Sequence, residues 1–362
     1  MPAMRVFSAD LLRTWAGEVL KALGVSDEDA AVAADVLVLG NLRGVDSHGI
    51  RLLVKNAEGL RDGALNPAPA MRIVEEKGPC AVFDGDGGMG QLVCMRAMEA
   101  ALGKAREEGA AVVATKRSSH CGMSAAYVLR AAQEDMIGVM LSNNKTSMAV
   151  AGGYDWTIGN NTIACGIPAV DHSPIVLDMS TSAITWGTVL TLAAAGGELP
   201  AYAAIRREPE GGPLTDPSKA YNEGTLLPIG GHKGSGLAVA IECLTGVLSG
   251  GPFAAEVSTV FLDTAKRENH SQFILVVSPE AFMETGVFKR RVSELITYIK
   301  NSPRLKSVEE ILLPGEKSAR CAAERSKRGV PLPQGVIESL NELAARVGAK
   351  PLPQGDASGR QT

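Results

Sequence analysis

The chain has 362 residues and a formal net charge of −4, with 45% hydrophobic and 21% charged residues. This length allows one large domain or two to three lobes around a sizeable core. Because no basic stripe is present, we expect neither nucleic acid nor an anionic membrane surface as a partner. No apolar window of about 18 residues is available to cross a bilayer, and the stretch MPAMRVFSADLLRTW does not resemble a signal peptide.

The six cysteines form no CxxC pair and show no metal-ligand spacing. Isolated cysteines of this kind are typical of small apolar side chains in a reducing compartment. The sequence therefore predicts free thiols, no metal site and a cytoplasmic protein.

The first 72 residues predict a helical lobe. One helix is expected after Ser8, where apolar residues recur at helical spacing, and a second after Ser26, which three acidic residues follow. A third helix follows Ser47, and the proline-rich stretch 66–69 ends the pattern. We expect this lobe to pack with residues 300–348, which include a helix over 334–346.

Residues 73–299 alternate between β-rich and helical stretches, which indicates an α/β core with a mixed or parallel sheet. Strands are expected at 80–83, 110–115, 137–142, 174–180 and 273–278. Helices are expected at 91–107, 124–134 and 289–300, with a buried helix over 234–250. The polar tail 349–362 is expected to be disordered.

A glycine loop formed by Gly85, Gly87 and Gly90 fits the G-x-G-x-x-G pattern of a Rossmann phosphate loop. Asp84 and Asp86 would place carboxylates beside a pyrophosphate, and the acid expected at the end of the next strand is replaced by basic residues at 116 and 117. We interpret the loop as a structural turn, while the basic pair could also meet a 2′-phosphate.

Five blocks carry most of the chemical information in this sequence. They are RGVDSHGIR at 43–51, SSHCG at 118–122, IGNNT at 158–162 leading into VLDMSTS at 176–182, LPIGGHKGSG at 227–236, and LPGE at 313–316. In these blocks and their order the sequence resembles the malate/L-lactate dehydrogenase family. The resemblance implies a homodimer and a non-Rossmann NAD(P)-binding fold. With the predicted elements, the expected architecture is α/β, with a mixed sheet core and a helical N-terminal lobe.

The resemblance implies that His48, His120 or both handle the proton in a hydride transfer. The histidine that matches His48 is the proton donor in some relatives, and the one that matches His120 is the base in others. A histidine that titrates near neutrality suits this task. The alternative for each is a backbone hydrogen bond or a helix cap. Asp46 or Ser47 could orient the His48 ring, and Ser47 is also a candidate substrate contact.

Arg51 is the candidate for holding a substrate carboxylate through two parallel hydrogen bonds. In some relatives the arginine matches the next position, Leu52, and one step on a helix turns a side chain by about 100°. A solvated surface arginine is the alternative.

Cofactor contacts with NAD or NADP are implied for four stretches of the chain. Lys233 lies among glycines that allow a ligand to approach, although a tight turn is the alternative. Glu316 could accept hydrogen bonds from ribose hydroxyls or simply begin a helix. The full set is Asn144, Asp178, Ser180, Thr181, Ser182, His232, Lys233, Gly234, Pro314, Gly315 and Glu316.

The sequence thus predicts an NAD(P)-dependent oxidoreductase that acts on a small 2-hydroxy or 2-oxo acid. A reductase of a cyclic imino acid, in which a C=N bond is reduced, is the alternative enzyme. A dinucleotide-binding protein without catalysis is the alternative from another class, and the two histidines argue against it.

Overall fold

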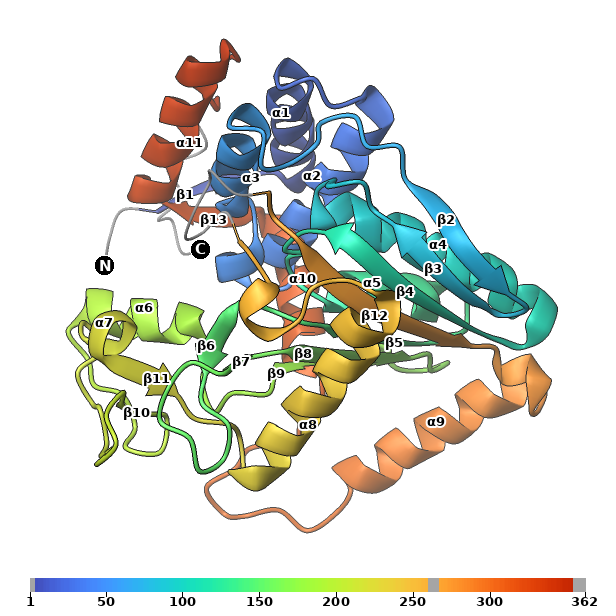
Figure 1. Ribbon diagram of the computed structural model, residues 1–362. Coiled ribbons are helices and arrows are strands. Elements are labelled where there is room, and N and C mark those ends of the chain that lie inside the picture. The colour runs from blue at the N-terminus through green and yellow to red at the C-terminus, as the bar shows by residue number, and fades with distance from the viewer. Residues whose placement is uncertain (1–3, 260–266, 354–362) are drawn as a thin grey trace.

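A seven-stranded sheet forms the centre of the computed structural model, which describes residues 4–259 and 267–353 (Figure 1). Across the sheet the strands are β2 (Arg72–Lys77), β3 (Cys80–Asp84), β4 (Ala110–Ser118), β12 (His270–Val277), β5 (Ile137–Ser142), β8 (Thr162–Ile167) and β9 (Ile175–Ser180). Only β3 and β4 are parallel neighbours in this sheet, and every other neighbouring pair is antiparallel. The predicted mixed α/β architecture is confirmed.

Helices α4 (Gly90–Glu108) and α5 (Ala125–Gln133) cover one face of this sheet. Side chains alternate between the faces along a strand, so Ile274 and Val276 of β12 pack with these helices and are fully buried. Ser271 points to the other face, where its hydroxyl meets that of Ser249. The same alternation directs His270 toward the layer of α4 and α5.

Helix α8 (His232–Glu242) continues into a short π-helix, η2 (Cys243–Val247), on the other face of the sheet (Figure 1). The sequence predicts a buried helix over 234–250, but only its inner side is buried. Val239, Leu244, Val247 and Leu248 form an exposed apolar face. Apolar composition does not distinguish a core helix from a helix whose outer side is apolar.

The helical lobe combines both ends of the described chain. It contains β1 (Met4–Phe7), α1 (Ala9–Ala22), α2 (Asp27–Leu42), η1 (Asp46–His48), α3 (Leu52–Arg61), α10 (Glu316–Arg328), β13 (Val330–Pro333) and α11 (Gln334–Val347). The Ser8 and Ser26 hydroxyls accept the N–H groups of Leu11 and Asp29 as N-caps, and both predicted helix starts are confirmed.

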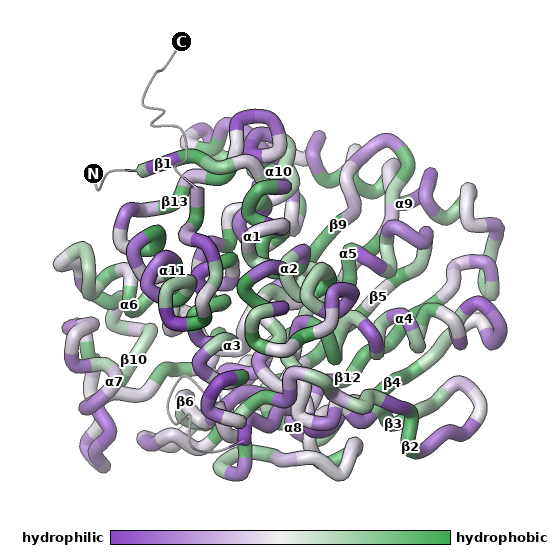
Figure 2. The backbone as a smooth tube through the Cα atoms, turned by 90° about the horizontal axis from the view of Figure 1, so that it is seen from above, coloured by the Kyte–Doolittle hydropathy of each residue, from purple (hydrophilic) through white to green (hydrophobic). Residues whose placement is uncertain are grey.

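The N-terminal and C-terminal segments of the lobe are joined by strand pairing and share one core. Strand β1 pairs antiparallel with β13, and Figure 2 shows this pair beside α1 and α10. Leu340 and Val330 are fully buried in one cluster with Leu12 and Leu37 of the first two helices.

Residues 349–353 are packed, although the sequence predicts disorder from residue 349. The Lys350 carbonyl accepts the indole N–H of Trp15 at 2.9 Å, and Leu352 is buried in the lobe. Two further hydrogen bonds hold this polar segment, from the Leu352 N–H to Oδ1 of Asn341 at 2.7 Å and from the Ala349 N–H to the Ala344 carbonyl at 2.9 Å. Residues 354–362 of the predicted tail lie outside the described residues.

A smaller four-stranded sheet lies beside the helical lobe and the main sheet (Figure 1). It contains β10 (Ala204–Arg206), β11 (Gly224–Leu226), β6 (Thr146–Met148) and β7 (Ile158–Gly159), with α6 (Trp186–Ala195) and α7 (Ala220–Glu223) around them. The remaining elements are η3 (Ala254–Glu256), η4 (Pro279–Ala281) and α9 (Thr285–Lys300). No helix in the described ranges is long and apolar enough to cross a membrane.

Candidate active site

His48 ends η1, in the turn between α2 and α3. The side chain of Asn41, at the end of α2, holds this turn. Its Nδ2 donates to Asp46 at 2.6 Å, and its Oδ1 accepts a backbone N–H just beyond His48. Arg325 of α10 binds the same Asp46 carboxylate at 2.7 Å. Asp46 therefore stabilises the turn and leaves the ring of His48 to another partner. Gly40 allows the His48 turn to lie close against α2, because a Cβ at this position would lie 2.7 Å from the His48 carbonyl oxygen.

His120 lies in the loop between β4 and α5. The N-terminus of α4 packs directly on this loop: the N–H of Gly90 donates to the Ser119 hydroxyl at 2.6 Å. A Cβ at Gly90 would lie 2.7 Å from the His120 carbonyl oxygen. From the other side, Oε1 of Glu268 accepts the backbone N–H of His120 at 3.2 Å.

The two histidine rings stack on each other, with centroids 5.6 Å apart and planes inclined by 29°. Burial, followed by the nearby charge of Arg51, lowers the pKa of His48. Burial, followed by the charges of His48 and His270, holds the pKa of His120 well below its ordinary value of about 6.5. Because two imidazolium rings at this spacing repel each other, the pair is predominantly neutral at neutral pH and holds at most one added proton.

The hydrogen bonds at Nδ1 differ between the two rings. Nδ1 of His120 accepts the N–H of Gly122 at 3.3 Å. Since a backbone N–H can only donate, the neutral His120 ring carries its proton on Nε2. Nδ1 of His48 lies 2.8 Å from the Ser47 hydroxyl, which can donate or accept. His48 can therefore place its proton on Nδ1 and leave Nε2 free to accept another.

Arg51 lies beside the histidine pair, where its charge acts on His48. It is exposed at the start of α3, whereas Leu52 is 6% exposed and packs in the helical lobe. Position 52 is therefore unavailable to a charged ligand, and Arg51 is the arginine of this block that faces solvent. Ser47 contacts His48 and also lies against Gly187, near the N-terminus of α6.

Backbone hydrogen bonds join two of the predicted cofactor stretches. The N–H of Ile229 donates to the Thr181 carbonyl at 2.8 Å, and the N–H of Ala183 donates to the Leu227 carbonyl at 2.8 Å. Thr181 and Ser182 thus lie beside the turn that begins α8. This turn needs Gly230 and Gly231, which have φ values of 60° and 62°.

His232 and Lys233 are exposed in the first turn of α8, while Gly234 is buried against Ile229. A Cβ at Gly234 would lie 2.8 Å from the Ile229 nitrogen. The N-terminus of an eleven-residue helix with an exposed lysine attracts an anionic group.

The predicted cofactor stretch 314–316 lies against β9, which contains Asp178 and Ser180. The Pro314 carbonyl accepts the N–H of Val176 at 3.0 Å, and Nη2 of Arg43 donates to the Gly315 carbonyl at 3.4 Å. Arg43 is 7% exposed, and burial lowers its pKa while Asp178 opposes that shift. Its Nε has no hydrogen-bond partner among the described residues. The sequence blocks contain Arg43, but only the fold reveals this buried and incompletely bonded cation.

Asp178 accepts the N–H of Ala125 at 2.7 Å. Burial raises the pKa of this carboxyl group to about 6, and the Ala125 hydrogen bond and the Arg43 charge only partly oppose the shift. The Asp178 side chain is nevertheless exposed at the surface, so solvent screens the effect of this shift on stability.

We expect Asp178→Asn to make the cofactor-free protein more stable than the wild type above pH 6. Between the unfolded pKa near 3.8 and the folded value near 6, the folded state binds more protons, so wild-type stability falls as the pH rises through this window. Asparagine cannot ionise and still accepts the Ala125 N–H. Urea midpoints at pH 4 and pH 7.5 test this expectation, and a gain at pH 4 that vanishes at pH 7.5 would contradict it.

Glu316 and Asn144 have other contacts in the structure. The Glu316 carboxylate binds Lys300 at 2.7 Å and also binds Arg320, and these contacts help to lower its pKa to about 2. Glu316 also begins α10, which is the alternative that the sequence left open. Asn144 donates its N–H to Asn161 at 2.9 Å, next to β7.

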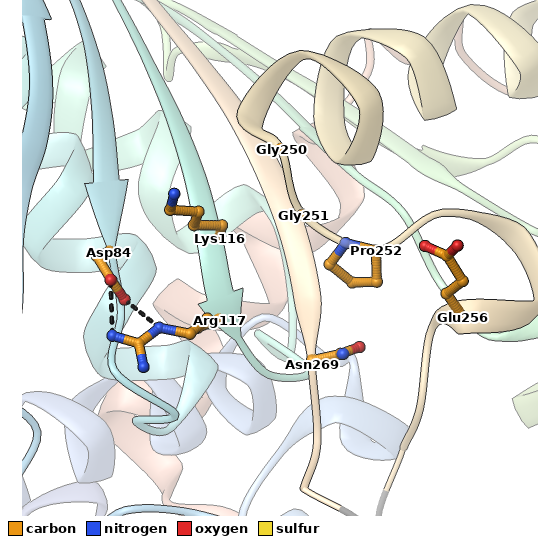
Figure 3. A pocket seen from close by; sticks show the side chains of 8 residues that line it. All are labelled: Asp84, Lys116, Arg117, Gly250, Gly251, Pro252, Glu256 and Asn269. Carbon is orange, nitrogen blue, oxygen red and sulfur yellow. Dashed lines mark hydrogen bonds and ion pairs between the residues drawn. The ribbon is translucent and has the colours of Figure 1, made fainter.

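The glycine loop at 85–90 packs against the C-terminal end of β4. The N–H of Gly85 donates to the Lys116 carbonyl at 2.9 Å, and Arg117 binds both oxygens of Asp84. Figure 3 shows Arg117 turned onto Asp84 at the edge of a pocket of about 480 Å³ that Lys116 and Asn269 also line. Because its guanidinium is already paired, Arg117 is not free for a 2′-phosphate. None of the predicted catalytic or cofactor residues lines this pocket.

Comparison with known proteins decides the family. Residues 7–341 match the family model described as malate/L-lactate dehydrogenase. The chain belongs to this family. The resemblance predicted from the five sequence blocks is therefore confirmed, and the chain is an oxidoreductase of the malate/L-lactate dehydrogenase family.

Three relatives illustrate the range of the family. The malate dehydrogenase of Pyrococcus horikoshii is 37% identical over 350 residues, which cover 95% of this chain and 96% of that protein. Its solved structure has a TM-score of 0.88 and 35% identity, with 96% of both chains covered. The L-sulfolactate dehydrogenase of Methanocaldococcus jannaschii is 39% identical over 91% of this chain and 94% of that protein. The Δ1-pyrroline-2-carboxylate/Δ1-piperideine-2-carboxylate reductase of Pseudomonas putida is 30% identical over 88% and 91%.

Proposed function

We propose that this enzyme transfers a hydride between a nicotinamide cofactor and a small 2-hydroxy or 2-oxo acid at the paired histidines. The observation that carries the proposal is the stacking of His48 and His120 beside Arg51. The two imidazoles are largely neutral and have different partners at Nδ1. They suit a reaction in which one ring moves the proton of the substrate oxygen and the other ring donates a hydrogen bond to that oxygen.

A dinucleotide fits the residues around β9 and the start of α8. The Thr181 hydroxyl and Nε of Arg43 are buried polar groups without hydrogen-bond partners in the described part of the chain, and Lys233 adds an exposed cation. Unsatisfied donors and a helix N-terminus favour an anionic, hydroxyl-rich ligand. We propose that Asn144, Asp178, Ser180–Ser182, His232–Gly234 and Pro314–Glu316 hold the cofactor, with Arg43 as an added member.

The bound nicotinamide supplies or takes up the hydride. In the oxidation of a hydroxy acid, Nε2 of His48 accepts the hydroxyl proton while Nδ1 donates to Ser47. Nε2–H of His120 donates a hydrogen bond to the same substrate oxygen and stabilises negative charge on it. In the reverse direction His48 returns the proton.

Arg51 is proposed to bind the substrate carboxylate. A guanidinium can form two parallel hydrogen bonds with a carboxylate, which fixes the orientation of the carbon that reacts. The carboxylate would also offset the charge that lowers the pKa of His48. Ser47, which contacts His48, is the second proposed substrate contact.

We further propose that the cofactor is held without a Rossmann domain. A single parallel neighbouring pair in the seven-stranded sheet and the closed 85–90 loop support this. Residues 1–72 with 300–348 are proposed as the lobe that carries His48, and residues 73–299 as the core.

A homodimer is supported by the exposed apolar face of α8 and η2. A cytoplasmic location is supported by six free thiols.

A cofactor-oxidation screen tests the proposed function. NADH and NADPH are each tested with about twenty acids that include 2-oxo acids and cyclic imino acids, because a few pocket contacts decide specificity. Turnover with a 2-oxo acid supports the proposal. Turnover restricted to cyclic imines would instead favour C=N reduction, as the name of the Pseudomonas putida relative describes. Cofactor binding without turnover on any acid would favour a non-catalytic protein.

Lys233→Ala is expected to weaken NADH or NADPH binding about tenfold and to leave kcat at saturating cofactor nearly unchanged. The exposed amine lies at the N-terminus of α8, where it would contact a phosphate or ribose oxygen. Titration of the cofactor fluorescence gives Kd, with Lys77→Ala of exposed strand β2 as the matched control. An unchanged Kd in Lys233→Ala would remove this residue from the cofactor site.

A further inference from the structure

Glu268 and His270 form a buried pair at the start of β12. Their side chains are each 2% exposed, and Nε2 of His270 lies 3.4 Å from Oε1 of Glu268. Nε2 has no hydrogen bond within the described ranges. Nδ1 lies 3.3 Å from the Asn143 carbonyl, which can only accept, so Nδ1 carries a proton and Nε2 faces the carboxylate.

The pair contacts His120 in two ways. Oε1 of Glu268 accepts the His120 backbone N–H at 3.2 Å and the Thr259 hydroxyl at 3.1 Å. The His270 ring meets the His120 ring at 6.4 Å and at an angle of 87°. His120 therefore lies between His48, which stacks on it, and His270, whose ring is nearly perpendicular to it.

A carboxylate and an imidazole are costly to remove from water, and such a buried polar pair stabilises a fold only weakly compared with apolar packing. The presence of this pair beside His120 is therefore better explained by a role in fixing the position of His120. The carboxylate fixes the backbone of His120, and the His270 ring limits the orientation of the His120 side chain.

We propose that Glu268 and His270 are positioning residues that act together to hold His120 in place for the substrate oxygen. The inference rests on the proposed function, since it requires His120 to touch the substrate. It adds two residues that none of the sequence blocks contains.

The test begins with Glu268→Gln, which keeps an acceptor oxygen but removes the charge that faces His270. We expect kcat to fall at least tenfold, with the KM of the substrate and the Kd of the cofactor changed less than threefold. A shift of about 1 Å in a catalytic group can cost up to about a hundredfold in rate. The rate is expressed per cofactor-binding site, so that unfolded protein does not contribute.

The matched control is Thr245→Val, which removes a buried hydrogen bond from Thr245 of η2 to the Ile241 carbonyl of α8. Loss of stability alone should lower the melting temperature of both variants but leave the kcat of the control unchanged. His270→Gln removes the other member of the pair and serves if Glu268→Gln does not fold. We expect Glu268→Gln/His270→Gln to be no slower than the slower single variant, because residues that act as a unit are not additive.

Four outcomes settle the inference. A fall in kcat for the single variants, without a further fall in the double variant, supports it. A kcat for Glu268→Gln equal to that of the Thr245→Val control, while His120→Ala is inactive, overturns the positioning role alone. Independent, multiplicative losses in the double variant also overturn it. Full turnover in His120→Ala would overturn both this inference and the proposed role of His120.

Discussion

His48→Ala is expected to lower kcat by at least about a hundredfold, as loss of a general acid–base group does. The Kd of the cofactor should change little, because the proposed cofactor contacts lie on β9, α8 and the 314–316 loop. His172→Ala, at an exposed histidine that lies apart from the paired rings, is the matched control. Steady-state rates and cofactor titration measure the two effects, and near-wild-type turnover in His48→Ala would remove this residue from the mechanism.

The same assignment predicts a pH profile. Oxidation requires an unprotonated Nε2 on His48, and the pKa of His48 is lowered by burial and by Arg51. The rate of oxidation should therefore be constant at neutral pH and fall only as the pH drops through a midpoint below 6.5. A midpoint above 7 in the free enzyme would contradict the electrostatic environment described for this histidine.

Two substitutions of His120 are expected to have very different effects. His120→Ala should lower kcat about a hundredfold or more, since loss of one donor to a developing oxyanion costs that much. His120→Gln, whose amide can supply a donor near the position of Nε2–H, should retain activity within about tenfold of the wild type. The contrast follows from the N–H of Gly122, which occupies Nδ1 and leaves Nε2 as a donor.

The comparison of the two variants also separates the roles of the paired rings. If His120 is the base, glutamine cannot replace it, and His120→Gln will be as slow as His120→Ala. The kcat of both variants, measured with the same acid and a saturating cofactor, decides between these assignments. Equal and severe losses would transfer the role of base from His48 to His120.

Local signals in the sequence predicted local structure well. The starts of α1 and α2 after Ser8 and Ser26 are predictable because a hydroxyl that caps a helix needs no tertiary partner. Helix α10 is predicted only as an alternative role of Glu316, because its residues are strongly polar and none of them is buried. The apolar run in α8 indicated a helix but not which side of it would remain exposed.

The arrangement of the candidate site could not be predicted from the sequence without the fold. The blocks around His48 and His120 identified the two residues through family resemblance, but their stacking depends on the packing of η1 against the β4–α5 loop. The pairing of Glu268 with His270 leaves no mark in the sequence, since it follows from the alternation of β12 and from its central place in the sheet. Arg43 was visible in a block, yet only its burial between Asp178 and Gly315 gives it a role.

The central place of β12 also bears on how the protein is made. This strand separates β4 from β5, and Gln272 bonds Thr115 across 157 residues of sequence. A nascent chain that ends before residue 270 would expose two unpaired strand edges in the middle of its sheet, a condition that favours aggregation. Pairings between such distant segments also slow folding. Catalytic competence should therefore appear late in synthesis, after nearly all of the polypeptide has left the ribosome.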